Sequence, residues 1–139
     1  MDGVRYKGRN NGQWGVALVE VRREQAIYPP YSNSINARGE FHIVTLVGTN
    51  YQNQADMFNT FELVDDKGRR FSEDINATSS YHTMTGTESY QNINPNQTEF
   101  NVEVFDIPRD VNIVKIRYEK YMNINESDFI ELPYHTIVE

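Results

Sequence analysis

The sequence contains no cysteine. This absence excludes disulfide bonds, thiol nucleophiles and thiolate metal sites, although it leaves the redox compartment undetermined. Histidine is scarce too, and His42, His82 and His135 are too far apart in the sequence to form a local zinc motif. We therefore expect no metal centre built from neighbouring residues, and no cofactor.

Long apolar runs are also missing. No stretch approaches the roughly 18 apolar residues of a membrane-spanning helix, and the first residues lack the apolar segment of a signal peptide. The sequence thus predicts no membrane insertion by this segment. Residues 1–13 are polar and contain glycine, which is typical of a flexible linker, and the length of 14–139 suits a single domain.

Basic residues are outnumbered, with 13 Lys and Arg against 20 Asp and Glu and a formal net charge of -7. A negative field repels phosphate backbones and anionic lipid headgroups, so the charge argues against a nucleic-acid partner. The 7 Phe and 9 Tyr residues, by contrast, predict a folded core rather than a disordered chain.

Alternation of apolar and polar residues indicates strands along most of the chain. The segments expected as strands are 14–22, 40–49, 58–64, 69–72, 98–107, 111–118 and 129–139. Asp65-Asp66-Lys67-Gly68 predicts a tight antiparallel hairpin, because Gly68 can adopt a positive φ. Pro133 restricts the last strand to a sheet edge or a bulge, because proline cannot donate to a ladder.

The segments between these strands are predicted to be irregular. Residues 25–39 contain Pro29-Pro30 and several other turn formers, and they are expected to form a long loop. Residues 73–97 are rich in Asn, Ser, Thr and Tyr without helical periodicity, so we expect them to cross between two sheets.

The two strands 98–107 and 111–118 are expected to pair as a hairpin. Phe100, Val102 and Val104 are expected to face the core. Together these patterns predict an all-β fold, an immunoglobulin-like antiparallel β-sandwich of about seven strands.

The sequence also resembles a known family in the segments 39–50, 61–71, 93–98 and 104–108, which occur in order within residues 14–118. They contain a strand ending in Asn50, a Leu-x-Asp-x-x-Gly-x-x-aromatic hairpin ending in Phe71, a turn around Pro95 and a Phe-Asp-x-Pro strand end at Pro108. This order resembles a bacterial telokin-like, immunoglobulin-like family of unknown function, found on secreted proteins and lipoproteins and related to a mycobacterial immunoprotective extracellular antigen. Asn96 replaces the usual glycine after Pro95, and no lipobox is present. The resemblance implies a location outside the cell or in the cell envelope and brings no catalytic residues.

Four carboxylates near the predicted hairpin are a candidate cation site. Asp65 and Asp66 lie in the turn, and Glu73 and Asp74 follow a few residues later. Carboxylate oxygens are the ligands that calcium prefers, but the spacing matches no calcium-loop pattern. The alternative is that the two aspartates hold the turn by bonding its backbone while Glu73 and Asp74 face solvent.

Tyrosine-rich polar segments are a candidate binding surface, made of Tyr28, Tyr31, Tyr81, His82 and Tyr90. Tyrosine with Ser, Asn and Gly is the composition of adaptable recognition loops. The alternative is that these rings cap the open ends of the sandwich, burying their faces and leaving the hydroxyls wet.

No combination of residues predicts catalysis. Ser79 and Ser80 precede His82, but adjacent positions do not place a serine oxygen on an imidazole, and no Gly-x-Ser-x-Gly motif occurs. His42 is expected to be a partly buried, hydrogen-bonded strand residue. We therefore expect a protein that is not an enzyme.

The first hypothesis is a noncatalytic accessory or interaction domain of the cell envelope or the extracellular space. Its partner would be another envelope protein or a surface polymer. The alternative hypothesis is a domain that binds a cation or small ligand through the acidic hairpin end and the tyrosine-rich loops. We expect a monomer or a weak dimer, because Lys115, Arg117 and Pro133 oppose pairing of exposed strands.

Overall fold

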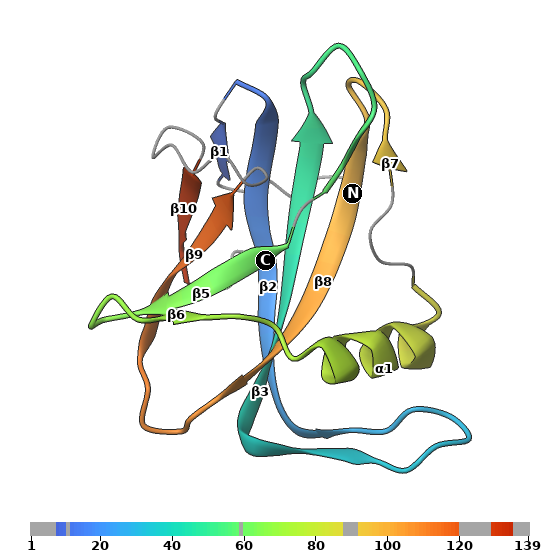
Figure 1. The fold of residues 1–139 in the computed structure, drawn as a ribbon, viewed down its shortest axis with the longest axis vertical. Helices are drawn as coiled ribbons and strands as arrows, with labels where there is room; N and C mark the ends of the chain where they lie inside the picture. The colour runs from blue at the N-terminus through green and yellow to red at the C-terminus, as the bar shows by residue number, and fades with distance from the viewer. Residues whose placement is uncertain (1–7, 11, 59, 88–91, 120–128, 135–139) are drawn as a thin grey trace.

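Two antiparallel four-stranded sheets pack face to face (Figure 1). The computed structural model describes residues 8–10, 12–58, 60–87, 92–119 and 129–134. The first sheet has the order β1-β2-β3-β8, and the second has the order β10-β9-β5-β6. The bounds of these strands are β1 Gly8–Asn10, β2 Trp14–Ile27, β3 Ile35–Asn50, β5 Phe61–Asp65, β6 Arg70–Phe71, β8 Thr98–Ile107, β9 Ile113–Glu119 and β10 Phe129–Pro133. A small ribbon pairs β4 (Asp56–Met57) with β7 (Asn92–Ile93).

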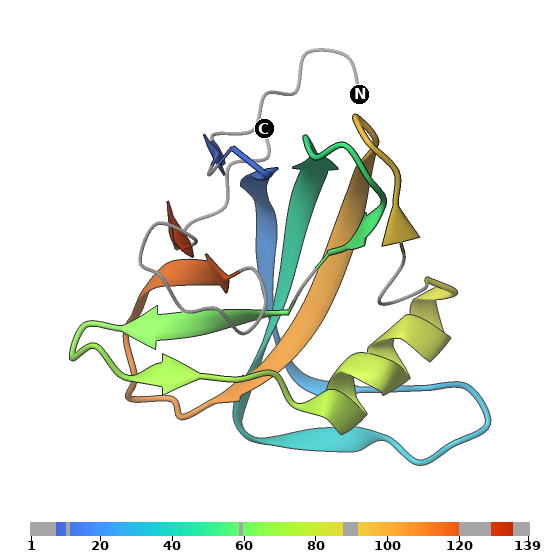
Figure 2. The ribbon, with the colours of Figure 1, turned by 45° about the horizontal axis from the view of Figure 1, so that its top comes forward.

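The strand order confirms the predicted immunoglobulin-like sandwich. In constant-type immunoglobulin domains a sheet A-B-E-D faces a sheet C-F-G. Here β2, β3 and β8 match strands A, B and E, whereas β5, β9 and β10 match C, F and G, with β6 added beside β5. Strand D has no counterpart beside β8 among the described residues, and a helix occupies that position instead (Figure 2).

The main core fills the space between the two sheets. Its buried residues come from both sheets and from the connections at their upper end, and they include Trp14, Leu18, Val44, Leu46, Phe61, Phe105, Ile116 and Tyr118. Trp14, Phe58 and Tyr118 form an aromatic cluster, with ring centroids 5.2 to 6.4 Å apart. Burial of these rings supplies a large share of the hydrophobic stabilisation.

A second, smaller core lies on the opposite face of the first sheet. Helix α1, Ile75–Thr85, packs there against β8 and β2. The buried residues of this core are Ile27, Phe41, Ile43, Ala77, Tyr81 and Val104. The sequence-based expectation that residues 73–97 lack a helix is therefore wrong.

Helix α1 begins and ends at capping residues rather than at a change in hydrophobic pattern. The Asp74 carboxylate accepts a hydrogen bond of 3.0 Å from Ala77 N, which is an N-cap. Gly86 ends the helix with φ 71°. Between the caps the helix is rich in Ser and Thr, which are poor helix formers, and so it depends on its packing against the sheet.

Four further expectations can be compared with the structure. The hairpin at residues 65–68 is confirmed, with Gly68 at φ 77° between β5 and β6. Residues 8–10, assigned to a linker, form β1 and pair with β2. Most of the expected long loop at 25–39 belongs to β2 and β3, which continue as a hairpin arm whose irregular tip is only 28–34. Pro133 lies at the end of the edge strand β10, as predicted, and the partner of β10 is β9.

The hairpin predicted between 98–107 and 111–118 is wrong. Strand β8 pairs with β3, whereas β9 pairs with β5 and β10. The turn that begins at Pro108 therefore crosses from one sheet to the other. Phe100, Val102 and Val104 lie on the outer face of the first sheet, because the core side of β8 is formed by Phe105 and Ile107.

Candidate functional site

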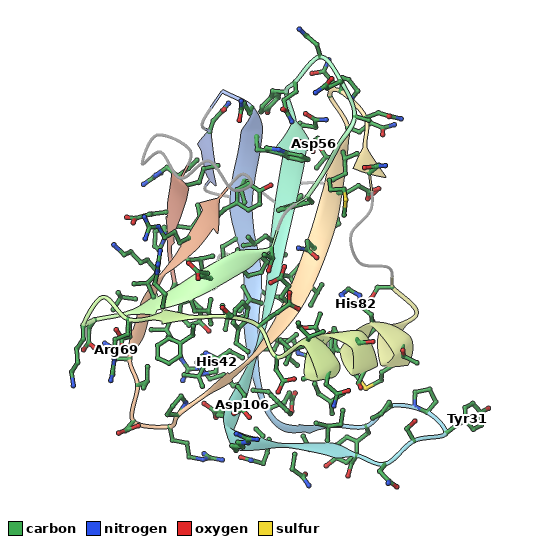
Figure 3. The ribbon with its side chains drawn as sticks, in the orientation of Figure 1. Tyr31, His42, Asp56, Arg69, His82 and Asp106 are labelled. Carbon is green, nitrogen blue, oxygen red and sulfur yellow. The ribbon has the colours of Figure 1, made fainter. Side chains whose placement is uncertain are left out.

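The predicted tyrosine surface is divided between exposed and buried positions. Tyr28 and Tyr31 are strongly exposed in the irregular tip of the hairpin arm. Figure 3 shows Tyr31 at this tip, where its φ is 60°. Tyr81 is buried in the small core under α1, so its expected place on the surface is wrong. Tyr90 lies outside the described residues, as does His135.

His82 is buried in α1 rather than in a loop. Its Nε2 lies 2.9 Å from the carbonyl oxygen of Val102 and its Nδ1 lies 2.6 Å from the hydroxyl of Thr87. Because a carbonyl only accepts, Nε2 carries the hydrogen and donates it. With both ring nitrogens engaged, His82 is not placed to activate Ser79 or Ser80.

Helix α1 covers part of the open edge of β8 through backbone and side-chain hydrogen bonds. Val104 N donates to the Thr78 hydroxyl at 2.9 Å, and Asp74 N donates to the Val104 carbonyl at 2.8 Å. His82 makes a similar contact with the carbonyl of Val102, which lies two residues before Val104 on β8. These bonds replace the ladder that a strand D would make, which is one way in which proteins protect an edge strand.

The four predicted cation ligands have different structural roles. Asp65 accepts hydrogen bonds from Lys67 N, Arg69 N and Arg69 Nε, at 3.0, 2.7 and 2.6 Å. Burial favours a higher pKa for Asp65, but these hydrogen bonds outweigh burial and hold the pKa below its ordinary value. Asp74 caps α1, and Asp66 is exposed in the turn. Across the part of the chain that the structure describes, no group of three or more His, Asp or Glu is placed to hold a metal ion.

Glu73, which is half-buried, lies beside the buried Glu103 in a pair of carboxyl groups that the sequence did not indicate. The Thr60 hydroxyl lies 3.1 Å from Glu73 Oε2 and 2.8 Å from Glu103 Oε1, and Asn101 Nδ2 donates to Glu103 Oε2 at 3.0 Å. A hydroxyl has one hydrogen, so the Thr60 hydroxyl donates fully to only one of the two carboxyl groups at a time. Burial, followed by the charge of Glu73, raises the pKa of Glu103 to about 8.

His42 confirms the prediction of a buried, hydrogen-bonded strand histidine. Its Nδ1 is hydrogen-bonded to the hydroxyl of Tyr134, and the two rings stack with centroids 5.7 Å apart. Burial, with a smaller effect of the Arg23 charge, lowers the pKa of His42 to about 4 despite the nearby Glu40. His42 is thus neutral at physiological pH and fastens the segment after β10 to the first sheet.

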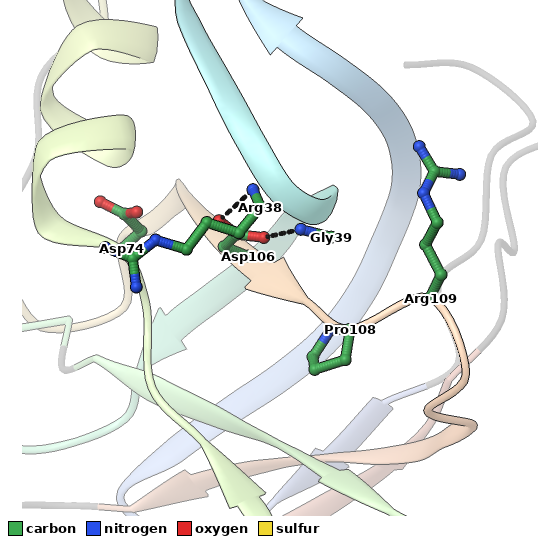
Figure 4. Close-up of a pocket in the computed structure, with 6 residues that line it drawn as sticks. All are labelled: Arg38, Gly39, Asp74, Asp106, Pro108 and Arg109. Carbon is green, nitrogen blue, oxygen red and sulfur yellow. Dashed lines mark hydrogen bonds between the residues drawn. The ribbon is translucent and has the colours of Figure 1, made fainter.

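A hollow near the base of the hairpin arm is lined by charged residues that hold structure together (Figure 4). Its volume is about 620 Å³. The Asp106 carboxylate accepts hydrogen bonds from Arg38 N and Gly39 N at 2.8 and 2.9 Å, and Arg109 donates to Gln25. Since Asp74 caps α1, the two carboxylates of this hollow are already used by the arm and the helix.

A second hollow lies on the upper half of the outer face of the first sheet, where α1 does not reach. We call it the face groove, and its volume is about 450 Å³, within the usual range for ligand sites. It is lined by Arg9, Asn10, Gly15, Val16, Ala17, Val47, Thr49, Tyr51, Thr98 and Phe100. Tyr51 is 49% exposed and Phe100 is 50% exposed. The face groove therefore presents two large rings to solvent on one surface.

The sequence contained little that could have revealed the face groove. Tyr51 stands in a polar turn directly after β3, and the alternation of β8 placed Phe100 in the core. The apolar residues on the outer side of β8 indicate a groove only once the position of α1 is known.

Comparison with known proteins supports the fold alone. No protein-family model and no curated protein sequence matches the chain. A conserved hypothetical protein from Bacillus anthracis is similar in structure, with TM-score 0.66 and 18% identity, covering 82% of this chain and 86% of that one. A "putative lipoprotein" from Bacillus subtilis has TM-score 0.65 and 10% identity, covering 93% of this chain but only 39% of its own length.

An uncharacterized β-sandwich protein from Clostridium difficile has TM-score 0.50 and 14% identity, covering 86% of this chain and 87% of that one. These similarities agree with a β-sandwich domain of unknown function, and none of the three descriptions names an activity. The telokin-like family and its mycobacterial antigen remain a prediction from the sequence. Among the described residues no helix has the length and apolar character required to cross a membrane.

Proposed function

We propose that this chain is a noncatalytic binding domain of the bacterial cell envelope and that the face groove is its binding surface. The observation that carries the proposal is the exposure of Tyr51 and Phe100 in one hollow. Aromatic rings are enriched where proteins bind partners and ligands, because they bury a large area at a small cost in conformational entropy.

The lining of the face groove supports binding rather than catalysis. General acid–base and nucleophilic chemistry most often uses a positioned His, Asp, Glu, Ser, Cys or Lys. None of these residue types occurs among the ten that line the groove, where Arg9 is the only charged side chain. A rigid sheet with satisfied ladders is a suitable platform for recognition.

Two observations support a location in the cell envelope. The Bacillus subtilis protein of similar structure is described as a "putative lipoprotein", and the sequence motifs resemble those of a family found on secreted proteins and lipoproteins. This chain spans only 39% of that neighbour, so the role of the rest of that protein is separate from this proposal.

The test is sedimentation of the purified chain with cell-envelope fragments from a Bacillus, comparing the wild type with Phe100→Thr. Threonine keeps a β-branched side chain on β8 but removes the ring. We expect Phe100→Thr to lower the apparent affinity at least about 10-fold, as loss of a central aromatic contact does. Val114→Thr is the matched control, because Val114 is 41% exposed on β9, which belongs to the other sheet.

A parallel variant tests the hairpin arm, whose tip carries two of the tyrosines that the sequence indicated. If Tyr31→Ser loses binding and Phe100→Thr does not, the arm is the binding surface and the face-groove proposal is wrong. Absence of any binding to envelope material would overturn the proposed function itself.

A further inference from the structure

The strand register arranges the face groove in rows of side chains. Residues directly opposite one another in antiparallel strands point to the same face. Ala17, Val47 and Phe100 are paired across β2, β3 and β8, and they form one row. The next row is formed in the same way by Gly15, Thr49 and Thr98. An apolar row with a ring thus lies beside a row that ends in hydroxyl groups.

Gly15 positions the second ring. A Cβ atom at residue 15 would lie 2.8 Å from Cε2 of Tyr51, which is closer than carbon atoms approach. The Tyr51 ring therefore occupies the space that a side chain at residue 15 would fill. The backbone of Tyr51 is held as well, because its N–H donates to the Gln13 carbonyl at 2.8 Å.

Polar groups surround the two rings. The hydroxyls of Thr49 and Thr98 lie 2.7 Å apart, and the hydrogen bond between them uses one hydrogen and one lone pair. The second hydroxyl hydrogen and the other lone pairs remain available for hydrogen bonds with a ligand. Asn10 adds an amide whose oxygen accepts from Gly12 N at 2.6 Å, so its nitrogen provides donors.

Tyr51 also connects the face groove to a neighbouring hollow of about 490 Å³ at the upper end of the sheet. That hollow is lined by Gly12, Gln13, Tyr51, Gln52, Asn53 and Gln54. The two hollows together form an extended surface of rings, hydroxyls and amides, with Arg9 as the only charged residue among those that line it.

The floor of the face groove offers few main-chain hydrogen-bonding groups to a peptide backbone. The main-chain groups of β2 and β3 at this level are engaged in the ladders between β1, β2, β3 and β8. A ligand lying over β2 and β3 on this face therefore meets side chains rather than main-chain groups. Sugar rings have an apolar C–H face and hydroxyl groups at their edges, which match aromatic rings bordered by hydroxyls and amides.

We propose that the face groove and the adjoining amide-lined hollow bind a neutral oligosaccharide chain, stacked on Tyr51 and Phe100. This inference rests on the proposed function, because it names the class of ligand for the same surface. The scarcity of charge in the lining and the net charge of -7 favour a neutral glycan over an anionic one.

The test is isothermal titration of the purified chain with cellotetraose, chitotetraose and maltotetraose, and with a pool of uncharged peptides. We expect saturable binding of at least one tetrasaccharide. Phe100→Thr and Tyr51→Ser are each expected to weaken binding at least about 10-fold, whereas Phe100→Tyr, which keeps a ring, is expected to stay within roughly 3-fold of the wild type.

Gly15→Ala tests whether binding depends on the position of the Tyr51 ring and not only on its presence. The added methyl group forces the Tyr51 ring to move but removes no side chain from the groove, so we expect weaker glycan binding with an unchanged melting temperature. Val114→Thr is the control that leaves binding unchanged.

Three outcomes overturn the inference alone, and a fourth overturns the proposed function with it. The first is binding of envelope fragments through Phe100 without binding of any tetrasaccharide, which leaves the proposed function standing. The second is preference for the peptides, and the third is a dimer in light scattering that Phe100→Thr dissociates, because a second copy would then occupy the groove. If neither tetrasaccharides nor envelope fragments bind, the proposed function fails together with the inference.

Discussion

The outer face of the β1–β2–β3–β8 sheet has two halves that differ in what covers them. In the lower half, Phe41, Ile43 and Val104 are buried beneath Ala77 and Tyr81 of α1. In the upper half no described helix or strand packs over Phe100 and Tyr51, which are 50% and 49% exposed, and a groove remains. The same strands therefore supply both a second hydrophobic core and a candidate binding surface, and the length of one short helix decides where each begins.

The largest expected effect on stability comes from weakening the packing of α1 over the lower half of the sheet. Tyr81→Ala removes a buried ring from the small core, and we expect it to lower the free energy of unfolding by about 3 kcal/mol. Denaturation in urea measures the change. Ile75→Ala is the control, because Ile75 is 74% exposed on the same helix, and its effect should stay below about 0.5 kcal/mol. Equal effects would contradict the packing described for α1.

The second effect concerns the edge of β8. Thr78→Val keeps the shape of the side chain but removes the oxygen that accepts from Val104 N. A buried N–H without a partner should lower the free energy of unfolding by about 2 kcal/mol. Exchange of the Val104 amide hydrogen should become faster at the same time. Thr83→Val, at an exposed position of α1, should leave both measurements close to the wild type. An unchanged exchange rate in Thr78→Val would show that the helix does not protect this edge.

The third effect lies at the boundary between the two halves, on the core side of β8. Because the pKa of Glu103 is raised to about 8, the folded state keeps a proton that the unfolded state releases above its ordinary pKa of 4.5. The free energy of unfolding should therefore fall as the pH rises from about 5 to about 8.

Glu103→Gln removes this titration while keeping the shape of the side chain. We expect the variant to be more stable than the wild type by about 2 kcal/mol near pH 7.5, with the difference shrinking towards pH 5. Thermal melts across this range measure the difference, and exposed Glu99→Gln is the control. A wild-type stability that does not change with pH would show that Glu103 is ionised in the folded protein.

The smallest expected effect belongs to the open half. Phe100→Thr should change the free energy of unfolding by less than about 1 kcal/mol, because the ring is already half exposed. Val104→Thr on the same strand places a hydroxyl in the small core and should cost more. Urea denaturation of the two variants compares the halves directly, and a larger loss for Phe100→Thr would mean that the ring is structural.

The strands of the sandwich could be predicted from local pattern, whereas their partners could not. Alternation identified residues 40–49 and 98–107 correctly, and Gly68 marked the tight turn. The short connection after Pro108 suggested a hairpin, but a connection of this length can also cross between packed sheets, and only long-range packing distinguishes the two.

The helix and the candidate site were missed for related reasons. The only local signals of α1 are its caps, Asp74 and Gly86, since its buried side is narrow and includes Thr78 and His82. Without α1, the apolar residues on the outer side of β8 could be assigned only to the core. The exposure of Phe100 depends on where that helix ends, and strand periodicity contains no information on this.

The order of the elements along the chain has a consequence for synthesis on the ribosome. Helix α1 precedes β8 in the sequence, and β3 precedes both. The polypeptide that protects the edge of β8 has therefore left the ribosome before β8 itself is complete, and helices form faster than long-range strand pairs. The nascent sandwich can close this edge as soon as it exists, before another chain has the opportunity to pair with it.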